Sequence, residues 1–137
     1  MGSPPTAPPV PFIVGVGRSG TTLLRLMLDA HPDLAIPPET HFVPDLIQLF
    51  EADEDATPDR VVEIVTSGRH WGDFGLEEEA LRERLERAEP LDAAGAIRAF
   101  FELYAERHGK LRWGDKTPIY VKDMTEIEAA RSSTSGR

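Results

Sequence analysis

A glycine-rich segment near the N-terminus carries the residues best suited to chemistry. Residues 15–22 read GVGRSGTT and stand between a short apolar run and a helical pattern that begins at Thr21. In this order of strand, loop and helix, the backbone N–H groups of the loop and the helix N-terminus point at one concavity, which favours a phosphate-like anion. The alternative is an ordinary turn in which Ser19 or Thr21 caps the helix.

The charge of this loop differs from that of a nucleotide triphosphatase loop. Gly15 and Gly20 have the spacing of the G-x-x-x-x-G-K-[ST] motif, but Thr21 replaces the lysine and the cation has moved to Arg18. The sequence also shows no apolar strand ending in Asp that would hold Mg²⁺, so ATP or GTP hydrolysis is disfavoured. A phosphosulfate carries less charge at its transferring end, and one Arg, one Lys and backbone dipoles can bind it without a metal.

Two elements must position the loop. The apolar run from Phe12 to Val16, interrupted only by Gly15, predicts a strand buried on both faces of a parallel sheet. The helical pattern from Thr21 to Ala30 then has one apolar side, made of Leu23, Leu24, Met27 and Leu28. We expect this side of the helix to pack against the strand.

Helical periodicity covers most of the remaining chain. It recurs at residues 41–50, 58–66, 76–88, 91–108 and 119–130. A second short strand is expected at residues 111–113 and a turn at 114–118, while residues 51–59 read as an acidic loop. The pattern therefore predicts an α/β fold, a P-loop-like parallel sheet flanked by helices, with helix in excess.

The chain is long enough for one domain with a hydrophobic core. Residues 1–11 contain five prolines and predict a disordered lead-in, and residues 131–137, RSSTSGR, predict a disordered tail. Ordered structure is expected over 12–130. Because parallel sheets usually have several strands and two covered faces, a sheet with only two strands predicts an incomplete domain.

Composition excludes several classes of partner and cofactor. The formal net charge of −9 gives no long-range attraction for nucleic acid or for an anionic membrane surface. There is no cysteine and the four histidines stand apart, so no metal site is expected. No apolar run reaches the ~18 to 20 residues that span a bilayer, and we expect a soluble cytoplasmic protein.

Two segments resemble a known family. The stretch from Phe12 to Thr40 is similar to the opening of the sulfotransferases that use 3'-phosphoadenosine 5'-phosphosulfate (PAPS), especially the branch of tyrosylprotein and many bacterial members. Residues 113–118, WGDKTP, resemble the segment in which that branch places an active-site lysine. Between the two segments the match is limited to helical character. The resemblance makes residues 12–130 part of a sulfotransferase domain.

The resemblance implies a role for each matching residue. Glu39 falls at the position of the general base that takes a proton from the acceptor. Lys116 falls where a cation stabilises charge on the sulfuryl oxygens and the departing phosphate, and Arg18 is also expected to touch the sulfuryl group. The residues expected to bind the 5'-phosphosulfate of PAPS are Gly17, Arg18, Ser19, Gly20, Thr21 and Thr22.

Each assignment has a simpler alternative. Glu39 can begin the next helix, where an acid complements the helix dipole, and Lys116 can be a solvated turn residue. Asp115 and Thr117 are expected to be turn formers. His41 stands where tyrosylprotein members carry an arginine, so an acidic peptide acceptor is not implied.

Three functions follow from these observations. The first is transfer of a sulfuryl group from PAPS to a hydroxyl or amine. The family's later element, which supplies an Arg and a Ser for the 3'-phosphate, has no counterpart here, so both an active enzyme and an inactive remnant are open alternatives. The second is a P-loop kinase-like protein that binds nucleotide. The third is a non-catalytic anion-binding or assembly module, whose exposed apolar surface meets a partner chain.

Overall fold

The computed structural model describes residues 10–15, 20–117, 120, 125 and 127–129. Within this part, the helices are α1 (Thr21–Asp29), α2 (Val43–Ala52), α3 (Pro58–Ser67), α4 (Glu78–Arg87), α5 (Ala93–Arg107) and the 3₁₀ helix η1 (Trp71–Phe74). The strands are β1 (Phe12–Ile13), β2 (Leu34–Ala35), β3 (Arg112–Trp113) and β4 (Asp115–Lys116). The fold is mixed α/β, rich in helix, with small parallel sheets.

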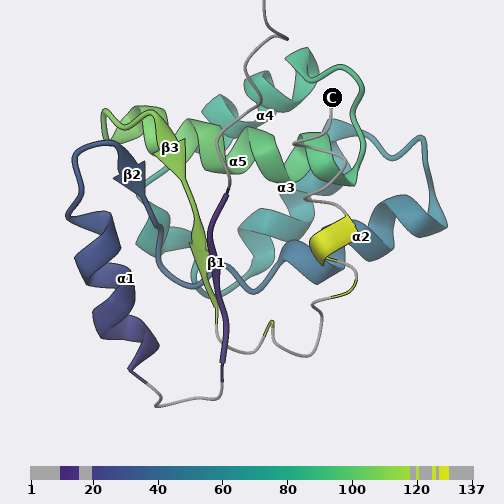
Figure 1. The fold of residues 1–137 in the computed structure, drawn as a ribbon. Helices are drawn as coiled ribbons and strands as arrows, with labels where there is room; N and C mark the ends of the chain where they lie inside the picture. Colours follow the sequence, from purple (N-terminus) through teal and green to yellow (C-terminus); the bar gives the residue numbers. More distant parts are fainter. Residues whose placement is uncertain (1–9, 16–19, 118–119, 121–124, 126, 130–137) are drawn as a thin grey trace, which may run out of the picture.

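Three stretches of chain lie side by side as parallel strands. β1 pairs with β4, and β2 pairs with β3. Only Gly114 separates β3 from β4, so residues 112–116 run between β2 and β1 (Figure 1). A Cβ atom on Gly114 would lie 2.6 Å from Cγ of Pro11, so this close approach requires glycine. The carboxyl ends of the strands therefore meet at one edge.

The hydrophobic core lies among α2 to α5. Phe100 and Phe101 on α5 are fully buried, and the ring of Phe100 packs edge-on against Phe42 and Phe74. Phe101 stacks on Trp113 of β3, with 4.5 Å between the ring centroids. Aromatic packing thus joins the helical layer to the strands, and the helical stripe of residues 91–108 is core as its periodicity indicates.

Most predicted helices are confirmed, with ends shifted by one or two residues. The predicted turn at 114–118 is wrong, because Asp115 and Lys116 form β4 and pair with β1. β2 and η1 were not predicted, and the expected acidic loop at 51–59 is shortened by both neighbouring helices. Residues 1–9 of the lead-in expected at 1–11 and the tail at 131–137 lie outside the described residues, as does most of the expected helix at 119–130.

The expected packing of α1 is wrong in its orientation. Leu23, Leu24, Leu26 and Met27 remain 43 to 65% exposed, whereas Leu28 alone of the predicted apolar side packs with Ile13, Leu34 and Ile36. Polar groups hold the helix instead. Arg25 Nε donates to the carbonyl of Ile36 at 2.9 Å, and the Ile36 amide donates to Asp29 Oδ1 at 2.7 Å. Helix α1 therefore lies beside β2 and apart from the helical layer (Figure 1).

Candidate active site at the strand ends

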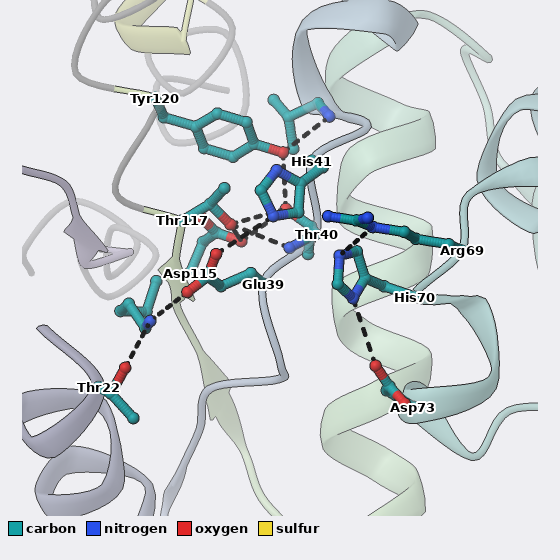
Figure 2. Close-up of polar contacts among 12 residues, drawn as sticks. Thr22, Glu39, Thr40, His41, Arg69, His70, Asp73, Asp115, Thr117 and Tyr120 are labelled. Carbon is teal, nitrogen blue, oxygen red and sulfur yellow. Dashed lines mark hydrogen bonds and ion pairs between the residues drawn. The ribbon is translucent and has the colours of Figure 1, made fainter. Parts of the chain in front are cut away.

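Two of the predicted catalytic residues meet where the strands end. Glu39 follows β2, and Lys116 is the last residue of β4. Lys116 Nζ lies 2.5 Å from Glu39 Oε2 and donates to Thr22 Oγ1 of α1 at 3.2 Å. Thr22 and Glu39, which Figure 2 labels, thus both contact this ammonium group. Lys116 thus joins Glu39 to Thr22, which lies 94 positions before Lys116 in the sequence.

Burial makes the ion pair of Glu39 and Lys116 asymmetric. The Lys116 side chain is only 3% exposed, whereas that of Glu39 is 35% exposed. Burial raises the pKa of Glu39, but the hydrogen bond and charge of Lys116, helped by His41, outweigh it and leave this pKa below its ordinary value. Glu39 is therefore an ionised base at neutral pH, and Lys116 is not the solvated turn residue of the alternative interpretation.

The glycine loop is only partly described. Gly20 begins α1 as its N-cap with φ of 85°, a left-handed conformation that side chains other than glycine rarely adopt. Thr22 is in the first turn of α1, so its hydroxyl lies near the helix N-terminus and contacts Lys116. Gly17, Arg18 and Ser19 lie outside the described residues, and Thr21 is placed only as the first residue of α1.

A buried hydrogen-bond network fixes the segments that carry Glu39 and Lys116. The Val43 amide donates to the Tyr120 hydroxyl at 3.0 Å, which lies 2.7 Å from Thr40 Oγ1. Thr40 Oγ1 in turn donates to Asp115 Oδ1 at 2.8 Å. The Thr40 amide also donates to Thr117 Oγ1 at 2.9 Å. The start of α2 is thereby tied to the end of β4 next to the ion pair (Figure 2).

Asp115 lies in β4, so its prediction as a turn former is wrong, whereas the Thr117 carbonyl accepts a hydrogen bond from the Tyr120 amide at 2.9 Å, the kind of bond that closes a turn. Asp115 and Thr117 are nevertheless core residues. Both are 0% exposed. Burial raises the pKa of Asp115 to about 7, although hydrogen bonds from Thr40 and Thr117 act in the opposite direction. Its Oδ2 atom has no hydrogen-bond partner among the described residues. Sequence reasoning missed this network, and the only signal for it was the run of polar residues directly after an expected strand.

A pocket of about 310 Å³ opens beside the segment that carries Glu39. Its apolar lining includes Phe42, Trp71 and Phe74, and its polar lining includes His41, Arg69 and His70. His41 Nε2 lies 3.2 Å from Glu39 Oε1, so one side chain touches both the base and the pocket. In the described part of the chain, no three His, Cys, Asp or Glu side chains are grouped so as to hold a metal ion.

The arrangement suits transfer of an anionic group. It combines an ionised carboxylate, a buried ammonium group and the first turn of a helix at the carboxyl edge of parallel strands, where α/β proteins bind ligands. None of the described helices is both long and apolar enough to cross a membrane. The fold and site thus define a mixed α/β protein in which a carboxylate, a buried ammonium group and a helix N-terminus meet at the strand ends.

Comparisons with known proteins identify the family. The model of the sulfotransferase family matches residues 9–131. Protein-tyrosine sulfotransferase 1 of Danio rerio is 33% identical over 121 residues, which cover 87% of this chain and 28% of that protein. Protein-tyrosine sulfotransferase 2 of Gallus gallus is 34% identical over 102 residues, or 74% of this chain and 22% of that protein. The chain belongs to the sulfotransferase family, which confirms the resemblance.

A higher identity is found over a shorter segment. Protein-tyrosine sulfotransferase of Drosophila melanogaster is 58% identical over 41 residues, which cover 30% of this chain and 8% of that protein. The chain spans less than a third of the length of these curated relatives. No solved structure matches the chain.

Proposed function

We propose that this protein transfers a sulfuryl group from PAPS to a hydroxyl or amine acceptor. The observation that carries the proposal is the meeting of Glu39, Lys116 and Thr22 at the strand ends, with Lys116 Nζ 2.5 Å from Glu39 Oε2 and 3.2 Å from Thr22 Oγ1. These residues come from two segments that resemble the family and from the helix that follows the glycine loop. Membership of the sulfotransferase family supports the same reaction.

Glu39 acts as the general base in this proposal. It accepts the acceptor's proton as the acceptor oxygen or nitrogen forms its bond to sulfur, while the bond between sulfur and the phosphate oxygen breaks. Lys116 stabilises the negative charge that grows on that departing oxygen. The products are the sulfated acceptor and 3'-phosphoadenosine 5'-phosphate (PAP), and the proton on Glu39 returns to water.

The glycine loop holds the donor in this proposal. PAPS supplies the activated sulfuryl group, and residues 17–22 bind its 5'-phosphosulfate as a P-loop binds phosphate. The described end of the loop supports such a fit, because Gly20 takes a left-handed conformation and Thr22 Oγ1 faces the Lys116 ammonium group. Arg18 adds the cation that this loop carries in place of the lysine of a triphosphatase.

The pocket beside His41 is the proposed acceptor site. At about 310 Å³ it has room for an aromatic side chain, and Phe42, Trp71 and Phe74 supply apolar contacts. The relatives named for protein tyrosine make a phenolic hydroxyl the first acceptor to test.

An assembly module is the second candidate function, favoured by the exposed apolar residues of α1.

Ligand binding and turnover test the proposal separately. We expect excess PAP to raise the thermal unfolding temperature followed by circular dichroism, and ATP with Mg²⁺ to leave it unchanged. With PAPS as donor, a tyrosine-containing peptide, a phenol and a primary amine are then compared as acceptors. Glu39→Gln is expected to lower turnover by about 10²- to 10⁴-fold, because it removes the base and keeps the side-chain shape.

Glu63→Gln is the matched control, since Glu63 is an exposed residue of α3 away from the strand ends. It is expected to leave PAP binding and turnover unchanged. An unfolding temperature that responds to ATP with Mg²⁺ but not to PAP would overturn the proposal in favour of the kinase-like alternative. Wild-type turnover that survives in Glu39→Gln would remove Glu39 from the reaction.

A further inference from the structure

The two oxygens of Glu39 are held by different residues. Lys116 binds Oε2 at 2.5 Å, and His41 Nε2 lies 3.2 Å from Oε1. A carboxylate with a partner on each oxygen cannot rotate freely about its terminal bond. The side chains of Glu39 and His41 are 35% and 40% exposed. Without His41, the Oε1 atom of Glu39 would therefore face solvent. His41 therefore restricts the orientation of Glu39 through the carboxylate oxygen that Lys116 does not bind.

The backbone of His41 also points to a constrained position. Its φ is 62°, in the left-handed region that side chains other than glycine rarely adopt. Such conformations persist where surrounding contacts compensate for them, and they gather at functional sites. Here the flanking residues are fixed, since the Thr40 amide donates to Thr117 Oγ1 and the Val43 amide donates to Tyr120. The buried network thus holds His41 in a conformation that brings its ring to Glu39.

A second imidazole supports the ring of His41. His70 stacks on it with 5.1 Å between centroids and 23° between ring planes. Arg69 Nε donates to His70 Nε2 at 3.4 Å, so that nitrogen accepts, and His70 Nδ1 then carries the proton toward Asp73 Oδ2 at 3.3 Å. Polar contacts at both ring nitrogens thus hold the His70 ring that stacks on His41.

We propose that His41 is a positioning residue, which orients the Glu39 carboxylate toward the acceptor through Oε1 and is itself held by the stack with His70. This role rests on the proposed function of Glu39 as the base. His41 also lines the pocket proposed for the acceptor, so the residue that orients the base contacts the same space as the acceptor. The charged groups around the pair are Lys116 beyond Glu39, Arg69 and Asp73 on His70, and Asp45 in the pocket wall.

The first test follows the Glu39 carboxyl carbon by NMR during a pH titration, without PAPS or acceptor. In the wild type the Glu39 pKa lies below its ordinary value, and His41→Gly is expected to raise it by removing the donor and the charge. Glycine also suits the left-handed backbone, so this variant should not unfold. His31→Ala is the control, because His31 lies beyond α1 and contacts Asp33. An unchanged Glu39 titration in His41→Gly would refute the contact.

The second test separates orientation from folding by kinetics. In a sulfation assay His41→Gly is expected to lower kcat about ten- to a hundredfold, since a misplaced base costs rate even when it is ionised. The KM for PAPS should stay the same, because residues 17–22 are proposed to bind it. His41→Gln keeps a donor near Oε1 without the imidazole and should recover most of the rate.

The outcomes distinguish this inference from the proposed function. If His41→Gly changes the Glu39 titration but Glu39→Gln retains full turnover, the contact stands while both the positioning role and the base assignment fail. If Glu39→Gln is inactive and His41→Gly keeps the wild-type kcat, only the positioning role fails. In a third outcome, His41→Gly lowers kcat, His41→Gln does not restore it, and both variants unfold at the wild-type temperature. This result would also count against orientation through the hydrogen bond.

Discussion

The helical layer and the α1 edge of this protein are stabilised in different ways. In the layer formed by α2 to α5, Phe100, Leu81 and Val61 have no exposed surface, and aromatic rings continue the packing to Trp113 of β3. At the edge, α1 leaves most of its apolar residues exposed and is attached by Arg25 and by polar groups near its C-terminus. The first region is a conventional core, and the second is held mainly by hydrogen bonds.

The candidate site lies on the border between these regions. Glu39 and Lys116 belong to segments that the buried network ties to the core, whereas Thr22 belongs to α1. Lys110 adds a second anchor for α1, because its ammonium group donates to the carbonyls of Asp29 and Leu34. Glu39 and Lys116 are therefore positioned by the well-packed helical layer, while the helix of the glycine loop is positioned by a few polar contacts.

The largest predicted effect removes the centre of the core. Phe100→Ala is expected to lower the free energy of unfolding by about 3 to 5 kcal/mol, since it leaves a cavity where three aromatic neighbours met. Chemical denaturation followed by circular dichroism measures this loss. Leu103→Ala on the same helix is the control, because Leu103 is only partly buried and should cost less. Equal losses in the two variants would contradict the view that α2 to α5 carry the stability.

The second prediction concerns the buried carboxyl at the border. Because burial raises the pKa of Asp115 to about 7, from its ordinary value of 3.8, folding favours its protonated form. The stability that Asp115 provides is thus complete below about pH 4 and is lost as the pH rises through about 7. In the wild type this loss should be on the order of 2 kcal/mol between about pH 5 and pH 7.5.

Asp115→Asn tests this prediction, since its neutral amide resembles the protonated acid. As the pH rises from about 5 to about 7.5, the variant should become more stable relative to the wild type. The variant is not expected to lose stability relative to the wild type at any pH in this range. Thermal unfolding of both proteins at a series of pH values measures the difference. A difference that does not depend on pH would show that Asp115 is ionised in the folded protein or is not buried.

The contrast between the regions also explains what the sequence could predict. Helices such as residues 91–108 were predictable, because their apolar residues recur over several turns and one stripe is buried. Strands of two residues, such as β2 and β4, are too short for a periodic signal, and β4 contains two charged residues. The buried Asp115 has one local hydroxyl partner, Thr117, but its closer partner is Thr40, and a contact so distant along the chain leaves no mark on the local sequence.

The same limit applied to the candidate site. Glu39 and Lys116 were singled out through a family resemblance, and their assigned roles stay proposals, whereas their contact at 2.5 Å required the fold. His41 appeared in the sequence only as a departure from the family pattern. Its left-handed backbone depends on the buried network, and its stack on His70 depends on η1, which no periodicity indicated.

The smallest predicted effect concerns the exposed side of α1. Leu23→Ser and Met27→Ser are each expected to change the free energy of unfolding by less than about 0.5 kcal/mol, because these side chains are 64% and 65% exposed and lose little contact. Sedimentation of the wild type and the double variant adds a second measurement. If α1 only positions Thr22, both proteins sediment alike. If the wild type alone self-associates with concentration, the apolar side of α1 is an assembly surface, and the edge is stabilised by a partner instead of by hydrogen bonds alone.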